Sequence, residues 1–140
     1  MEGARLMNTF SLTIVTPDGV QFDGQAEELV VRTTTGDMGI LAGHMNCVAP
    51  LGMGMATVMT DGQKRYGACI GGMVSVLNGQ VKLVPTTFEW ADKIDLPRAQ
   101  ASGQRAKDIL ANKSATDTDL RLAEARLKRA LIRQSVAQYK

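Results

Sequence analysis

The spacing of apolar residues changes period near Trp90, and this change most constrains what the chain can fold into. Before it, apolar and polar residues alternate over short runs, as at Phe10, Leu12 and Ile14. A period of two is typical of half-buried strands. After it, residues 96–111 are alanine-rich, with apolar positions three and four apart, which is the spacing of a helix. The chain therefore combines a strand-rich part with a helical part.

The strand-rich part carries regularly spaced turn signals. Thirteen of the 14 glycines lie before Trp90. Asp-Gly at 61–62 and Asn-Gly at 78–79 are flanked by apolar runs and predict hairpins, and Pro-Asp-Gly at 17–19 predicts a tight turn. The first strands are predicted at 10–15, 20–22 and 28–34. Many short strands at this spacing indicate a β-sandwich or barrel.

The helical part predicts an antiparallel two-helix hairpin. Asp95 is suited to cap the first helix, and Thr116 or Asp117 the second. The second helix has one apolar stripe, formed by Leu120, Ala123, Leu127, Ala130 and Leu131. Because the break between the helices is short, the two should pack side by side. Such a hairpin is too small for a core of its own, so it must dock elsewhere, and more than one docking site is conceivable.

Charge is divided between the same two parts. Residues 8–90 are predicted as the sandwich domain and 91–140 as the hairpin domain, with 1–7 an N-terminal extension or residues added to the protein. Up to Trp90 the chain holds 5 Lys/Arg and 8 Asp/Glu, a net charge of −3; beyond it there are 11 and 6, a net charge of +5. This asymmetry suggests that the hairpin meets something acidic.

Composition excludes several classes of protein. With 44% hydrophobic and 21% charged residues, the chain is typical of an ordinary soluble domain. No apolar run approaches the ~18 residues of a membrane span, and there is no pattern of a secretory signal, so a cytoplasmic protein is expected. His44, Cys47 and Cys69 are too few for a closed zinc site, and we expect a turn histidine and two buried thiols.

Three segments, in order, resemble the epsilon subunit of bacterial F-type rotary ATP synthases. They are GDMGILAGHM at 36–45, IGGM at 70–73 and IDLPRA at 94–99. Ala42 stands where the family usually has proline. The resemblance extends over about 8–138, nearly the whole chain. It implies a β-sandwich followed by a helical hairpin, in agreement with the residue patterns.

The resemblance also implies a role. Epsilon is a non-catalytic rotor subunit of a proton- or sodium-translocating synthase, whose sandwich contacts the gamma subunit and the c ring. Its hairpin either folds down on the sandwich or extends into the alpha/beta catalytic hexamer, where it inhibits ATP hydrolysis. The implied location is peripheral, at the cytoplasmic face of the bacterial plasma membrane. Gly39 and His44 would lie in a turn near the rotor contacts.

Basic residues of the second helix are the predicted contacts with the catalytic hexamer. Arg126, Arg129 and Arg133 lie at i, i+3 and i+7 and share a helical face, and Lys128 adds charge nearby. In the extended placement this stripe would pair with acidic segments of the catalytic subunits. Such contacts would depend on salt concentration.

A regulatory ATP site is the further implication of the resemblance, because some bacterial members bind ATP through an I/L-D-x-x-R-A motif and additional arginines. The matching residues here are Glu89, Ile94, Asp95, Arg98, Ala99, Arg105, Arg129 and Arg133. Arginines form bidentate bonds to phosphate oxygens, and Glu89 or Asp95 would accept from the adenine amine or orient an arginine. No Walker loop is present, so ATP would act as a regulator without being hydrolysed. We expect no required cofactor. The alternative is that Asp95 is only a helix cap and that Arg98 and Arg105 are solvated.

Two other functions are conceivable for such a chain. A stand-alone nucleic-acid-binding module would use the basic helices. A net charge of +5 over fifty residues favours phosphate binding only weakly, and 4% aromatic residues offer few rings for stacking on bases. A small enzyme built on a β-sandwich would need a nucleophile–base pair or a metal set, and the sequence offers neither.

Overall fold

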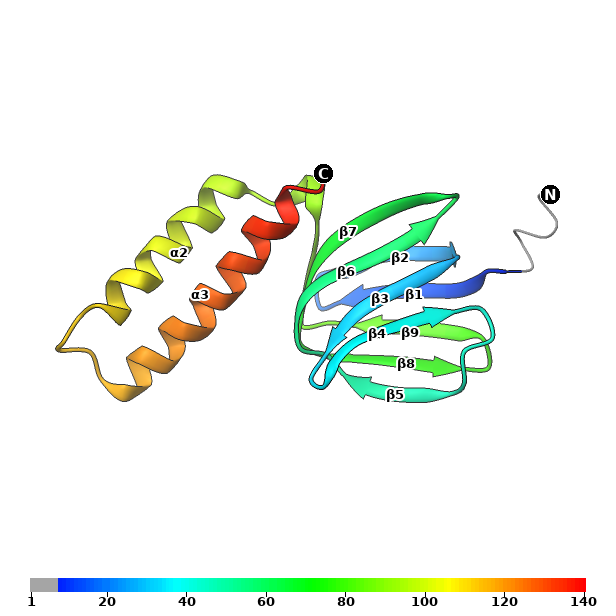
Figure 1. Ribbon diagram of the computed structural model, residues 1–140, viewed down its shortest axis with the longest axis horizontal. Coiled ribbons are helices and arrows are strands. Elements are labelled where there is room, and N and C mark those ends of the chain that lie inside the picture. Colours follow the sequence, from blue (N-terminus) through cyan, green and yellow to red (C-terminus); the bar gives the residue numbers. More distant parts are fainter. Residues whose placement is uncertain (1–7) are drawn as a thin grey trace.

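The structure is a computed structural model that describes residues 8–140, so the predicted extension at 1–7 lies outside the described residues. Two layers of strands form one body, and a helical hairpin projects from one end of it (Figure 1). The predicted β-sandwich followed by a two-helix hairpin is confirmed. Among the described residues, neither helix combines the length and apolar character needed to cross a membrane.

Each layer of the sandwich is a five-stranded sheet, with orders β2-β1-β9-β8-β5 and β10-β7-β6-β3-β4. Neighbouring described strands are antiparallel except for β1 and β9, which are parallel. The strands are β1 (Phe10–Thr16), β2 (Gly19–Ala26), β3 (Glu28–Thr33), β4 (Gly36–Leu41), β5 (Cys47–Pro50), β6 (Met53–Thr60), β7 (Gln63–Ile70), β8 (Met73–Leu77), β9 (Gln80–Val84) and β10 (Thr87–Trp90).

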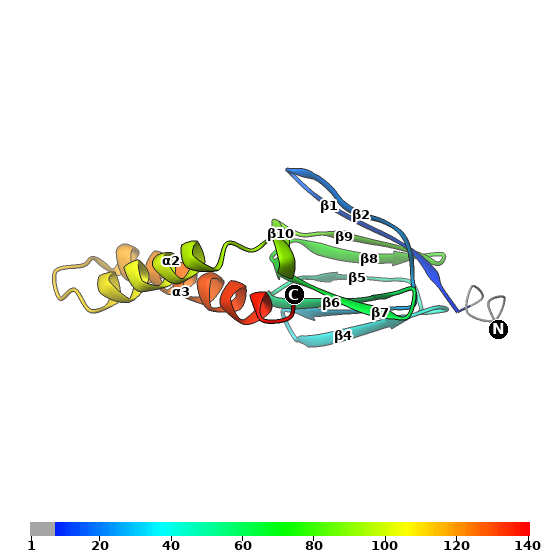
Figure 2. The same ribbon diagram turned by 90° about the horizontal axis from the view of Figure 1, so that it is seen from above.

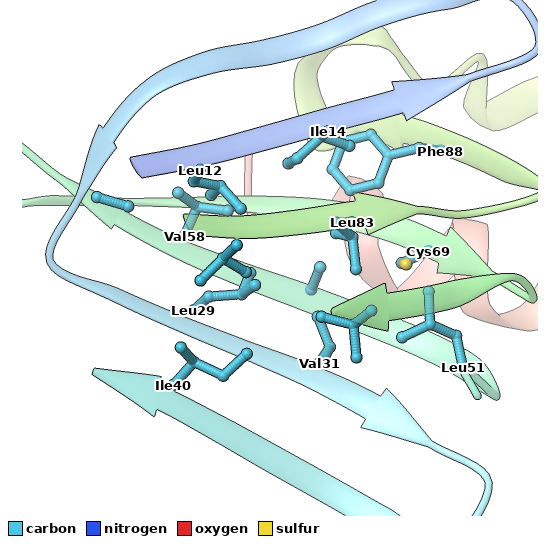
Figure 3. Packing of buried hydrophobic residues seen from close by; sticks show 14 of the residues in the cluster. Leu12, Ile14, Leu29, Val31, Ile40, Leu51, Val58, Cys69, Leu83 and Phe88 are labelled. Carbon is cyan, nitrogen blue, oxygen red and sulfur yellow. The ribbon is translucent and has the colours of Figure 1, made fainter. Parts of the chain in front are cut away.

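The core lies between the two sheets. On β1, buried and half-buried residues alternate, and Leu12 and Ile14 are fully buried, as their period of two predicts. Figure 3 shows Leu12 and Leu83 of one sheet facing Leu29 and Val58 of the other. Burying a side chain of this size stabilises the fold by about 1.5–3 kcal/mol.

Local turn chemistry explains the hairpins. Asp61 and Gly62 have φ of 52° and 73°, and Asn78 and Gly79 have 50° and 79°. Positive φ at both central residues is the type I′ turn that Asp-Gly and Asn-Gly favour. The predicted hairpins are therefore confirmed.

Gly72 has a conformation that only glycine tolerates here. Its φ is +92°, and a Cβ built on it would overlap the carbonyl oxygen of Val84. The Gly72 carbonyl accepts from the backbone N–H of Leu51 at 2.8 Å. The close approach of these backbone segments requires a residue without a side chain.

Two capped helices follow the one-turn η1 (Ala91–Lys93): α2 (Leu96–Leu110) and α3 (Asp117–Ala137). The Asp95 carboxylate accepts from the backbone N–H of Arg98, as predicted for an N-cap. Thr116 and Asp119 form a reciprocal capping box at the start of α3. Each helix therefore starts where a side chain satisfies its free backbone N–H groups.

Small residues hold the two helices together. The buried residues at this interface are Ala99, Gly103 and Ala106 of α2 and Ala123 and Ala130 of α3. A Cβ on Gly103 would lie 3.4 Å from that of Ala130, so the helices approach closely. The predicted apolar stripe is wrong at Leu131, which is 48% exposed. Leu131 lines a cleft between α3 and the sandwich.

The hairpin rests on the sandwich through one small apolar patch near the end of α3. Val136 is buried against Ala68 of β7 and Ala91 of η1. The partly buried side chains around them are Met55, Tyr66, Ile94 and Ile132. We call these seven residues the docking patch. Figure 2 shows the hairpin tip extending away from the sandwich beyond it.

Candidate ligand groove between hairpin and sandwich

A groove of about 340 Å³ lies where the hairpin meets β7 and β10. This volume is at the lower end of the range for small-molecule sites, about 300–1,000 Å³. Its lining residues are Ile70, Thr87, Glu89, Ser102, Arg126, Arg129, Ala130 and Arg133, and we call it the arginine groove. Sandwich and both helices each contribute to its wall, so the groove exists only while the hairpin is docked.

Three arginines of α3 line the groove from one side. Arg126, Arg129 and Arg133 share a helical face and all three border the same space. Arg126 is exposed, whereas Arg129 and Arg133 are half-buried. Among the described residues, Arg126 and Arg129 have no carboxylate within ion-pair distance. The groove therefore offers two uncompensated guanidinium groups.

The third arginine is paired across the groove. Nε of Arg133 is 2.7 Å from Oε1 of Glu89, and Nη2 donates to Oε2 at 3.2 Å. The two side chains are 21% and 36% exposed. Glu89 lies on β10, the edge strand beside the hairpin (Figure 2). The carboxylate orients an arginine, which is one of the two roles considered for it.

On α2, only Ser102 lines the groove. Arg98 and Arg105 lie four residues before it and three after it, so they share its helical face. Both are exposed and neither lines the groove. The structure therefore does not bring Arg98 and Arg105 into the groove with the α3 arginines.

The remaining motif residues have structural positions. Asp95 is exposed, and its Oδ1 accepts from the Arg98 N–H at 3.1 Å. Ile94 belongs to the docking patch. Ala99 is buried between the helices, and its carbonyl accepts from Nε2 of Gln134 at 3.4 Å. The geometry of Asp95 is that of a helix cap, the alternative given for it.

Lys128 is separated from the arginines with which it was grouped. It lines a cleft of about 820 Å³ between α3 and the β3–β4 turn, opposite Arg32 and Thr33–Thr35. The next residue, Arg129, lines the arginine groove. One helical step rotates a side chain by about 100°, so two adjacent basic residues face different surroundings.

Neither Gly39 nor His44 lines the arginine groove, and Gly39 lies within a strand and not in the turn predicted for it. Gly39 is in the edge strand β4, with open space over its Cα. His44 is half-buried in the β4–β5 connection, where Nδ1 is 2.8 Å from the carbonyl oxygen of Met45. Figure 1 places this connection far from the hairpin.

The two thiols are free but differ in burial. Cys69 is buried, and desolvation raises the pKa of its thiol to about 12. Cys47 is half-buried, which corrects the expectation of two buried thiols. It lies on β5, at the edge of its sheet, where one side of the strand has no neighbour.

Sequence reasoning missed Ile70, Thr87, Ser102 and Ala130 as groove residues, Ala130 having been expected only in the apolar stripe. For Ser102 a signal existed, because it falls between Arg98 and Arg105 on one helical face. For Thr87 the signal was its alternation with Glu89 on a short strand. Ile70 had no signal, because it comes from a strand far from the motif in sequence.

The fold and groove define a class: a β-sandwich that carries a helical hairpin, with an arginine-lined groove at their junction. The family described as ATP synthase, Delta/Epsilon chain, matches with its beta-sandwich domain over residues 9–91 and with its long alpha-helix domain over 92–138. The chain therefore belongs to the delta/epsilon chain family of ATP synthases. It is a non-catalytic subunit, and the resemblance read from the sequence is confirmed.

Individual relatives agree with this assignment. The ATP synthase epsilon chain of Bacillus velezensis is 44% identical over 131 residues, covering 94% of this chain and 98% of that protein. That of Ruminococcus albus is 40% identical over 136 residues, covering 96% and 100%. In solved structures, a chain of the Euglena gracilis mitochondrial ATP synthase has the same fold, with a TM-score of 0.79 at 22% identity and coverage of 94% and 82%.

Proposed function

We propose that this chain is the epsilon subunit in the rotor of a proton- or sodium-translocating F-type ATP synthase and links the gamma subunit to the c ring. Family membership over nearly the whole chain supports this role. The Euglena structure with the same fold is titled as an assembly of OSCP, F1 and c-ring. The proposed location is peripheral, at the cytoplasmic face of the bacterial plasma membrane. The exposed β4–β5 connection, with His44, is the proposed rotor contact.

The hairpin is the proposed inhibitor of ATP hydrolysis. Among the described residues, a small docking patch, one ion pair and a contact between two tyrosine rings connect it to the sandwich. A contact of this size is compatible with two placements that differ by a few kcal/mol, which a ligand or partner can rebalance. Once the hairpin is undocked, the arginines of α3 would be free to meet acidic segments of the alpha/beta catalytic hexamer.

ATP is the proposed regulatory ligand of the arginine groove. The observation that carries this proposal is that Arg126, Arg129 and Arg133 line one groove between hairpin and sandwich. Guanidinium groups suit phosphate oxygens because they donate two parallel hydrogen bonds. A ligand held by both α3 and β10 stabilises the docked hairpin by mass action, and so opposes inhibition.

Calorimetric titration of ATP into the complete chain tests this site. The comparison is Arg129→Ala against Lys128→Ala, two neighbouring cations of the same helix that face different surroundings. We expect Arg129→Ala to weaken binding at least tenfold, about 1.4 kcal/mol, and Lys128→Ala to change it less than twofold. Absence of binding at millimolar ATP, or equal losses in both variants, would remove the ATP proposal and leave the rotor role intact.

The inhibitory role has its own test. An ATPase complex is reconstituted with either the complete chain or residues 1–90, and hydrolysis is measured at low and high ATP. We expect faster hydrolysis with the shortened chain, most clearly at low ATP. Equal rates under every nucleotide condition would contradict inhibition by the hairpin.

The alternative of a stand-alone nucleic-acid-binding module is not supported. The chain belongs to a family of ATP synthase subunits. In addition, the arginines that would contact phosphate backbones lie in a narrow groove, and Arg133 is already paired with Glu89.

A further inference from the structure

The last residues of the described chain make an aromatic contact that the arginine groove does not use. The rings of Tyr139 and Tyr66 have centroids 4.8 Å apart and an interplanar angle of 39°. Tyr139 is the second residue after α3, and its backbone N–H donates to the carbonyl of Val136 at 2.9 Å. The ring is therefore held in place by a turn that continues the docking patch.

The surroundings of this pair are basic and aromatic. Tyr66 and Tyr139 border a small cavity of about 190 Å³ that is also lined by Lys64, Arg65, Trp90, Ala91, Asp92 and Lys140. The Arg65 guanidinium lies 3.8 Å from the centroid of the Trp90 ring. This cation–π contact keeps the wall of the cavity in place beside Tyr66.

Solvent exposure distinguishes this pair from the aromatic pair inside the sandwich. Phe88 and Trp90 have a similar centroid distance, 4.9 Å, but both are buried and belong to the core. Tyr139 is 49% exposed, and Tyr66 is half-buried. The Tyr66–Tyr139 contact can therefore open into water without disturbing the core.

We propose that Tyr66 and Tyr139 form a latch that keeps α3 docked, and that opening this latch disassembles the arginine groove. Three contacts with the sandwich follow one another at intervals of three residues along the end of the hairpin. Arg133 pairs with Glu89 of β10, Val136 packs within the docking patch, and Tyr139 contacts Tyr66 of β7. The latch is the last and most exposed of these three contacts. Once Tyr139 is released, solvent reaches Val136, and Arg133 is the next contact to be freed.

Hydrogen exchange of the complete chain, without nucleotide, tests the latch. Tyr139→Ala should speed exchange of the amides of residues 131–139 about 2- to 10-fold, the range expected for loss of one aromatic pair. Tyr139→Phe keeps the ring and should exchange as the unaltered protein does. Exchange in β6 and β7 should not change in either variant, which shows that the sandwich remains folded.

A double-mutant cycle separates a latch from independent packing. Tyr66→Ala should speed exchange in the same segment, and combining it with Tyr139→Ala should add little, because either change alone breaks the contact. Additive effects would overturn the proposal, as would unchanged exchange in Tyr139→Ala or fast exchange in Tyr139→Phe.

The effect of the latch on the groove rests on the proposed function. Tyr139→Ala should weaken ATP binding about 2- to 10-fold although residue 139 does not line the groove, whereas Tyr139→Phe should not. If the unaltered chain binds no ATP, the ATP proposal fails, and the exchange results still decide whether the latch exists. If ATP binds equally well to both variants, the latch does not control the groove.

Discussion

Glu89 and Arg133 lie 44 positions apart in the chain and form an ion pair that joins the last strand of the sandwich to the second helix of the hairpin. It lies next to two arginines that have no carboxylate within ion-pair distance among the described residues. The pair therefore connects α3 to β10 at the wall of the arginine groove. Weakening it should loosen the hairpin before it affects the sandwich.

Glu89→Gln should favour undocking of the hairpin by about 0.5–1 kcal/mol. Glutamine keeps the shape of the side chain but lacks the charge that attracts Arg133. In the unaltered chain, solvent screens this attraction only in part, because both side chains are partly buried. Hydrogen exchange of residues 125–137 measures the change. Glu124→Gln, on the exposed side of α3, is the matched control and should leave exchange unchanged; a similar effect there would mean that net charge, and not the ion pair, is responsible.

Asp95→Ala should lower the stability of the hairpin by about 0.5–2 kcal/mol, because the N-cap acceptor of α2 is lost. Asp95→Asn keeps an acceptor and should cost much less. Circular dichroism during urea unfolding measures both. Asp95→Asn also tests the role of Asp95 in ATP binding. If Asp95 is only a helix cap, this variant should bind ATP as the unaltered chain does. A tenfold loss of affinity would instead assign the carboxylate to the ligand.

Gly72→Ala should destabilise the sandwich by at least about 2 kcal/mol. The substitution combines a strained positive φ with an overlap on the Val84 carbonyl. Gly39→Ala is the control, since open space surrounds that position, and its cost should stay below about 1 kcal/mol. Thermal unfolding of the two variants would contradict this account if their midpoints were equal.

Alkylation should separate the two cysteines. At pH 8 iodoacetamide should modify the half-buried Cys47 and leave Cys69 unmodified until the chain unfolds, because burial holds Cys69 in the unreactive thiol form. Mass spectrometry of the digested protein measures both. Modification of Cys69 at the rate of Cys47 in the folded protein would show that β7 opens readily.

The raised pKa of Cys69 also predicts a pH dependence of stability. The unfolded thiol ionises near pH 9.0, whereas the folded one stays protonated up to about 12. Stability is therefore fully retained below pH 9 and falls as pH rises toward 12, since the unfolded state then binds fewer protons. Cys69→Ala lacks this group, so its thermal midpoint should fall less between pH 8.5 and 10.5 than that of the unaltered chain. Parallel curves would contradict the prediction.

Local chemistry explains what could be read from the sequence. Asp61-Gly62 and Asn78-Gly79 specify type I′ turns through the φ values that these residues adopt. Asp95 and Thr116 start the helices because their side chains satisfy backbone N–H groups within three residues. The period of two on β1 also predicted which of its residues are buried, because the alternation of side chains between the two faces is a property of the single strand.

Positions that depend on how elements pack could not be read in this way. Leu131 and Lys128 face a cleft with the sandwich because of the angle at which α3 docks, and the helical period alone carries no information on that angle. Cys47 is half-buried because the strand order leaves β5 at a sheet edge. Glu89 meets Arg133 because docking of the hairpin brings the Arg133 side chain within reach of β10. The sequence supplies the residues of the arginine groove, and the docking of the hairpin brings them to one place.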